Sequence, residues 1–139
     1  MGRRMCETAA LWVERLLPPV GYRQWVLSLP GPMAVRLGYD AALLGAVCRV
    51  FTTRLSQQLR RRAKRHHKRS TVSRLHAGVI TVVQRFRSDL GLYVHLHCLV
   101  ADGVFDEVLG DVAEAEGGRP PPAFLPVPEP TDEDLPRPE

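Results

Sequence analysis

The feature that most constrains this chain is an alternating run at residues 93–101, YVHLHCLVA. In a β-strand, successive side chains point to opposite faces of the sheet. His95 and His97 would therefore share one face with Tyr93. The other face would carry an unbroken apolar stripe, made of Val94, Leu96, Cys98 and Val100. This pattern is typical of a strand with one face in the core and the other in solvent.

The two histidines are a candidate metal site. Two imidazoles at a two-residue spacing on a rigid strand can ligate one divalent ion. The same spacing also occurs where two polar residues simply line a solvated face, and the local pattern does not separate these interpretations. Asp102 follows the strand and could reach the ion or shape a turn with Gly103; we expect the turn, followed by a short strand from Val104.

A second apolar run, His76 to Phe86, precedes the histidine strand and is rich in β-branched residues. A six-residue link containing Gly91 joins the two runs, which predicts an antiparallel hairpin. If the hairpin is centred on this link, Gln84 lies opposite His95 and becomes a candidate third ligand. A slip of one residue would place Gln84 on the other face.

The other elements complete an α+β pattern. We expect an amphipathic core helix over Met5 to Leu17, a strand over Gly21 to Leu29, a turn at Pro30-Gly31-Pro32 and a long helix from Asp40 to about Arg65. Asp40 is a suitable N-cap for the long helix. The predicted fold is an antiparallel sheet with helices on one face, which leaves the histidine face open.

The far end of the long helix is strongly basic. Within residues 60–69 stand Arg60, Arg61, Arg62, Lys64, Arg65, Lys68 and Arg69. So many cations exceed what a helix C-terminus requires, and they predict contact with nucleic-acid phosphates. The alternative is a solvated helix end. Residues 1–101 hold 17 of the 19 Lys and Arg but only 4 of the 15 Asp and Glu, which favours a polyanion-binding body with an acidic tail.

Composition excludes several other classes. No apolar run is long enough to span a bilayer, and the N-terminal segment lacks the apolar core of a signal peptide. The three cysteines form no C-x-x-C pair, so we expect reduced thiols in a cytoplasmic protein. Eight of the 12 prolines fall in residues 117–139, which we expect to be extended or disordered. We therefore divide the chain into an N-terminal helix (1–20), a core (21–116) and a tail (117–139).

Several segments, taken together, resemble one family. YRQWVLSLP, the long helix with its basic end, GVITVVQRF and LYVHLHCLVADGVF occur in this order, with a weaker echo in FLPVPEPTDEDL. In this order they resemble rolling-circle transposases of the insertion sequence 91 type. These belong to the HUH superfamily, named for a His-hydrophobic-His motif that would here be His95-Leu96-His97.

The resemblance implies both a fold and a chemistry. It implies a ferredoxin- or RRM-like sheet with the HUH motif on a central strand. It also implies that the histidines hold Mg²⁺ or Mn²⁺ on a phosphate of single-stranded DNA, and that a tyrosine nicks and transfers the strand during DNA transposition.

This chain departs from the family pattern in two respects. It lacks a Cys-rich upstream module, and no tyrosine follows His97. We therefore assign no catalytic residue and interpret the chain as a partial transposase with an incomplete fold. The alternatives are a non-catalytic RRM-like nucleic-acid-binding module, an unrelated metal enzyme that uses H-x-H, or an inactive remnant that does not fold stably.

Overall fold

The computed structural model describes residues 11–107 and 122–131. Its elements are the short π-helix η1 (Trp12–Leu16), β1 (Tyr22–Ser28), α2 (Gly31–Tyr39), α3 (Ala41–His66), β2 (Leu75–Phe86), β3 (Leu92–Asp106) and β4 (Ala123–Pro126). The strands form one antiparallel sheet in the order β1-β3-β2, and β4 also pairs with β3. This α+β architecture confirms the predicted fold class.

β3 is the central strand of this sheet. β2 pairs with it along nearly its whole length, from Leu92 to Asp106. On the other edge, β1 pairs with residues 95–101 and β4 with residues 103–106. The histidine strand is therefore hydrogen-bonded on both sides, which fixes the positions of its side chains.

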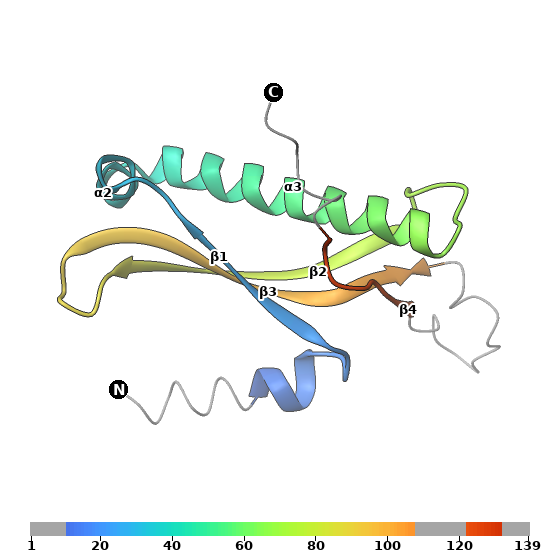
Figure 1. The fold of residues 1–139 in the computed structure, drawn as a ribbon. Coiled ribbons are helices and arrows are strands. Elements are labelled where there is room, and N and C mark those ends of the chain that lie inside the picture. The colour runs from blue at the N-terminus through green and yellow to red at the C-terminus, as the bar shows by residue number, and fades with distance from the viewer. Residues whose placement is uncertain (1–10, 108–121, 132–139) are drawn as a thin grey trace.

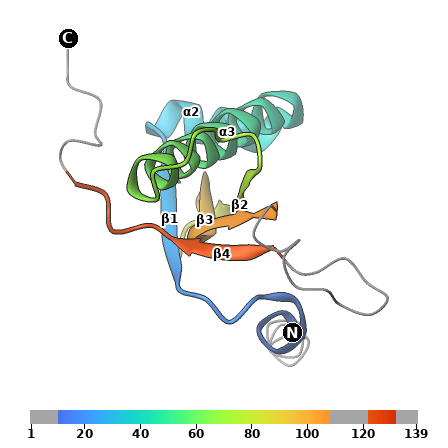
Figure 2. The same ribbon diagram turned by 90° about the vertical axis from the view of Figure 1, so that its right-hand side faces the viewer.

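The helices α2 and α3 cover one face of the sheet, whereas η1 lies on the other side (Figures 1 and 2). The apolar stripe of β3 faces α3, and its residues are at most 1% exposed. One part of the core joins β3 to the C-terminal half of α3 and to Val127. A second part joins the start of β3 to Leu37 of α2 and Leu44 of α3. The predicted core face of β3 is confirmed.

Helix α3 begins as expected. The Asp40 carboxylate accepts a hydrogen bond from the Leu43 N–H at 2.8 Å, which satisfies one of the unpaired amides at the helix start. The apolar stripe of the helix then packs on the sheet, with Leu44, Leu55 and Leu59 buried.

The turn expected at Pro30-Gly31-Pro32 is instead the start of a helix. Pro30 is the N-cap of α2, and Pro32 stands in its first turn, where the lack of an N–H costs no helical hydrogen bond. Ala34 and Leu37 are the buried residues of α2. The Pro-Gly-Pro motif is compatible with either a turn or a helix start, and the packing of α2 on the sheet favours the helix.

The turn expected at Asp102-Gly103 is also wrong, because β3 continues through both residues to Asp106. Val104 and Phe105 thus belong to β3 and do not begin a new strand. A side chain at Gly103 would collide with the Leu125 carbonyl of β4. The glycine therefore allows the close approach of a neighbouring strand and makes no turn.

At the ends of the described chain, the tail is extended, which is one of the two states expected, but the burial of side chains differs from expectation at both ends. Part of the tail is a paired strand: β4 pairs with β3, and Val127 just beyond it is only 6% exposed. The alternation of Leu125 and Val127 places apolar side chains toward the core despite the flanking prolines. At the N-terminus, core packing is wrong for Leu16, which is 65% exposed. Residues 5–10 of the expected helix lie outside the described residues.

Candidate functional site

The predicted register of the hairpin is confirmed. Gln84 pairs with His95 and Val82 with His97, so Gln84 and both histidines share one face of the sheet. On the other edge of β3, Ser28 pairs with His95 and Val26 with His97. The histidines thus lie in the middle of the face opposite α3, each with a neighbour on both sides.

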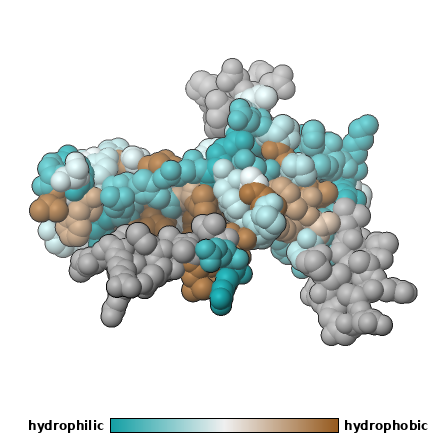
Figure 3. All heavy atoms as spheres, turned by 90° about the horizontal axis from the view of Figure 1, so that it is seen from below, coloured by the Kyte–Doolittle hydropathy of each residue, from teal (hydrophilic) through white to brown (hydrophobic). Residues whose placement is uncertain are grey.

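This face is open to solvent around the histidines. Val26 and Val82, which flank His97, are 52% and 55% exposed. Seen from this side, hydrophobic patches alternate with hydrophilic ones (Figure 3). Apolar side chains that are this exposed in the middle of a sheet contribute little to the stability of the fold. They are therefore available for contact with a ligand.

The His95 ring is held by its own strand. Its Nδ1 lies 3.0 Å from the Tyr93 carbonyl oxygen. A carbonyl oxygen only accepts, so Nδ1 carries the proton and Nε2 of the neutral ring carries a lone pair. This arrangement, with Nδ1–H bonded to a backbone oxygen, is the one that metal-ligating histidines commonly use.

The His97 ring has a different partner. Its Nδ1 lies 2.7 Å from the side-chain nitrogen of Gln24 on β1. Its Nε2 is buried and has no hydrogen-bond partner. An unsatisfied buried nitrogen next to another histidine, with ring centroids 4.9 Å apart, suits a site that an ion completes. The sequence did not predict this role of Gln24, because it shows only the place of Gln24 in the alternation of the strand.

The donors around the histidines are of two kinds: the imidazole nitrogens suit ions such as Zn²⁺, Fe²⁺ or Ni²⁺, and the Gln84 amide offers a hard oxygen of the kind that Mg²⁺ and Mn²⁺ prefer. Gln84 is exposed, and its side-chain nitrogen makes only a long contact, 3.5 Å, with the Phe86 carbonyl. Across residues 11–107 and 122–131, no three His, Cys, Asp or Glu side chains gather as a metal site would require. A complete coordination shell would therefore need Gln84, water or a phosphate oxygen.

An aromatic row runs along this face. Tyr93 and His95 have ring centroids 6.1 Å apart, and the row continues to His97. The Tyr93 hydroxyl donates to the Leu29 carbonyl at 2.6 Å. Tyr93 is thus held as a fixed ring, with its hydroxyl already hydrogen-bonded to the protein.

The strand positions that share the histidine face carry no Lys or Arg. Its β1 residues are Tyr22, Gln24, Val26 and Ser28, and its β2 residues are Ile80, Val82 and Gln84. The described strands therefore supply no Lys or Arg side chain to the centre of this face.

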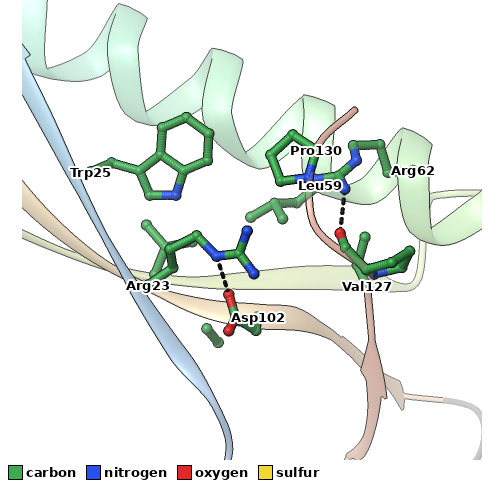
Figure 4. Close-up of a pocket in the computed structure, with 10 residues that line it drawn as sticks. Arg23, Trp25, Leu59, Arg62, Asp102, Val127 and Pro130 are labelled. Atoms are coloured by element: carbon green, nitrogen blue, oxygen red, sulfur yellow. Dashed lines mark hydrogen bonds and ion pairs between the residues drawn. The ribbon is translucent and has the colours of Figure 1, made fainter. Parts of the chain in front are cut away.

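Asp102 lies on the opposite face from the histidines. It accepts a hydrogen bond from Arg23 Nε at 2.9 Å and lines a small pocket with Leu59 and Arg62 of α3. Figure 4 shows Arg23 and Asp102 pointing toward one another on the α3 side of the sheet. The weaker interpretation of Asp102 as a metal ligand is therefore wrong, because strand alternation turns its carboxylate toward α3.

The seven basic residues at the end of α3 have unequal environments. Arg60 donates to the Val72 carbonyl, Arg62 donates to that of Pro128, and Arg69 pairs with Asp106 at 3.1 Å. The side chains of Arg61, Lys64, Arg65 and Lys68 are exposed, and Arg65 also has a partner within the protein. All seven lie on or just after α3, and the structure does not bring them to the histidine face.

A pocket of about 180 Å³ lies beside this basic end. It is lined by Arg69, Ser70, Thr71, Arg74, Leu75 and Asp106. The Nε of Arg69 is buried there without a hydrogen-bond partner. Arg74, which the sequence reasoning did not select, is exposed and adds a second guanidinium. Its position in the sequence, just before β2, gave no signal of this proximity.

Comparison with known proteins adds one finding about identity. Residues 78–120 match the model of a family described as a putative transposase. The match covers most of β2 and all of β3, hence Gln84 and both histidines, and it supports a transposase-like role. No curated protein and no solved structure matches the chain. Within the described residues, no helix has the length and hydropathy that crossing a bilayer requires.

Proposed function

We propose that this chain is the DNA-contacting sheet of a transposase. In this proposal, the histidine face binds single-stranded DNA through a divalent ion, Mg²⁺ or Mn²⁺, held by His95, His97 and Gln84. The observation that carries the proposal is the unsatisfied Nε2 of His97 beside His95, in a segment similar to a transposase family.

The chemistry of the face supports an ion-dependent contact. When bound, a divalent ion supplies a positive charge that attracts and polarises a DNA phosphate. The surrounding strand positions contribute no cation, so phosphate binding here depends on that charge. The Tyr93–His95 row and the exposed Val26 and Val82 provide flat and apolar surfaces for the bases.

Cleavage of the DNA strand is not part of this proposal. Both tyrosines on the histidine face have bonded hydroxyls, Tyr22 to the Pro18 carbonyl at 2.9 Å and Tyr93 to the Leu29 carbonyl. Burial also raises the pKa of Tyr22 above its ordinary value, which disfavours the phenolate that would attack a phosphate. Tyr39 is exposed on α2 and lies away from the histidine face.

The test is binding of a fluorescent single-stranded oligonucleotide with and without Mn²⁺. We expect Mn²⁺ to tighten binding by at least tenfold in the native chain, and the double variant His95→Ala/His97→Ala to lose this gain. The matched control is His66→Ala/His76→Ala, which removes two exposed histidines elsewhere and should keep the gain.

The alternative is an RRM-like module that binds the strand by stacking alone, which the aromatic row favours. Binding that is insensitive to Mn²⁺ but lost on Tyr93→Ala would support this alternative and reject the metal site. Appearance of a cut strand would contradict the exclusion of cleavage.

A further inference from the structure

The contact between Gln24 and His97 leaves open which ring nitrogen carries the proton. The Gln24 side-chain nitrogen lies 2.7 Å from His97 Nδ1. An amide that rotates by 180° about its terminal bond presents its oxygen at the same place, so the contact accommodates either group. The two orientations place the proton of the neutral His97 ring on different nitrogens.

The buried environment of the ring distinguishes the two orientations. If the Gln24 nitrogen donates to Nδ1, the proton of His97 lies on Nε2, which is buried without an acceptor. If the Gln24 oxygen accepts from Nδ1–H, Nε2 instead carries a lone pair. Orphaned buried N–H groups are rarer in proteins than orphaned acceptors, so the second orientation is favoured even without an ion.

The second orientation also makes the two histidines equivalent. His95 already has its Nδ1–H bonded to an oxygen, the Tyr93 carbonyl. With the Gln24 oxygen on His97 Nδ1–H, both rings would present Nε2 as a lone pair. Oxygen partners of this kind fix the ring orientation and raise the basicity of a ligating imidazole.

We propose that Gln24 is a positioning residue whose amide oxygen holds His97 in the tautomer that leaves Nε2 free to bind the ion. The inference rests on the proposed metal site. β1 places Gln24 opposite Leu99, one diagonal step from His97, which is within reach of a long side chain. Gln24 itself does not touch the ion or the DNA.

Two substitutions at this exposed position test the proposal. In Gln24→Glu, the carboxylate can only accept, so it keeps the Nδ1–H tautomer. In Gln24→Leu, the side chain has a similar size but no hydrogen-bonding group. Because residue 24 is exposed, neither variant should prevent folding, and circular dichroism checks this.

The first measurement is the ring tautomer of His97 in the metal-free protein at pH 8, from long-range ¹H–¹⁵N spectra. We expect the Nδ1–H form in the native chain and in Gln24→Glu, and a mixture of tautomers in Gln24→Leu. A native ring protonated at Nε2, or a tautomer unchanged by Gln24→Leu, would overturn the inference.

The second measurement is Mn²⁺ affinity by titration calorimetry without DNA. We expect Gln24→Leu to bind Mn²⁺ about 10- to 100-fold more weakly, the range typical for loss of an outer-shell partner, and Gln24→Glu to bind at least as tightly as the native chain. Equal affinity of Gln24→Leu and native chains would overturn the role of Gln24 and leave the metal site standing. A native chain that binds no Mn²⁺ would instead overturn the metal site, together with any role of Gln24 toward it.

Discussion

Leu90 occupies a backbone conformation that suits glycine. Its φ is 64°, in the left-handed region, at the tip of the hairpin between β2 and β3. The side chain is 81% exposed, so it contributes little packing in return for the strain.

Leu90→Gly should therefore stabilise the protein. Removing the Cβ relieves roughly 1 kcal/mol of strain, partly offset by the greater freedom of glycine in the unfolded chain. We expect a net gain of a few tenths of a kcal/mol in the free energy of unfolding, measured by urea denaturation. A loss of stability would show that the Leu90 side chain makes a contact that its exposure conceals.

Asp89, in the same turn, should titrate abnormally low. Its carboxylate accepts from the Gly91 N–H at 3.0 Å and from Arg87 at 2.9 Å. The backbone hydrogen bond from Gly91, and then the Arg87 charge, hold the pKa of this carboxyl below its ordinary value. A lowered pKa means that the turn is stabilised above the unfolded-state pKa, about 3.9, and loses this contribution as pH falls through the folded-state pKa. A carboxyl NMR titration giving an ordinary value would contradict the observed contacts.

At the scale of elements, the two faces of β3 differ sharply in burial. Leu96 is 1% exposed on the α3 side, whereas Val82 of the neighbouring strand is 55% exposed on the histidine side. The sheet thus depends mainly on one face for its stability and leaves the side chains around His97 on the other face exposed.

Substitution to alanine should reveal this difference. Leu96→Ala creates a cavity between β3 and the helices and should cost about 2–5 kcal/mol in the free energy of unfolding. The matched variant Val82→Ala should cost less than about 1 kcal/mol, because its side chain is already largely in solvent. Similar losses for both variants in chemical denaturation would mean that the histidine face is covered.

At the scale of the whole molecule, the basic end of α3 and the histidines lie on different sides of the sheet. α3 covers one face, and His95 and His97 lie on the other (Figure 1). One DNA strand could contact both surfaces only by passing around an edge of the sheet. The two surfaces should therefore contribute to DNA binding independently.

Salt dependence separates the two contributions. Changing the exposed Arg61, Lys64 and Lys68 to Gln should lower the slope of log K against log salt by about 0.7 for each phosphate that the protein no longer neutralises, while the Mn²⁺ effect remains. Changing Arg74 to Gln tests the pocket beside them in the same way. His95→Ala/His97→Ala should do the reverse, losing the Mn²⁺ effect with little change in slope, as measured by fluorescence anisotropy. Loss of both effects in either variant would indicate one continuous binding surface.

The sequence by itself determined the local features of this protein. The period-two alternation fixed which side of β3 holds His95 and His97, and the hairpin placed Gln84 opposite His95. Both follow from chain geometry over some 20 residues, where the pleat and a short link leave few alternatives. The cap at Asp40 and the apolar stripe of α3 are local in the same sense.

Only the tertiary structure decided the features that depend on distant segments. Pairing with β4 accompanies the extension of β3 through Gly103. Asp102 lies on the α3 side of the sheet, where its carboxylate pairs with Arg23. Likewise, Arg62 became a structural donor to Pro128, 66 residues away, and Gln24 met His97 across 73 residues. A charged or amide side chain takes its role from whichever group the fold brings near it, and residue type and spacing do not encode that neighbour.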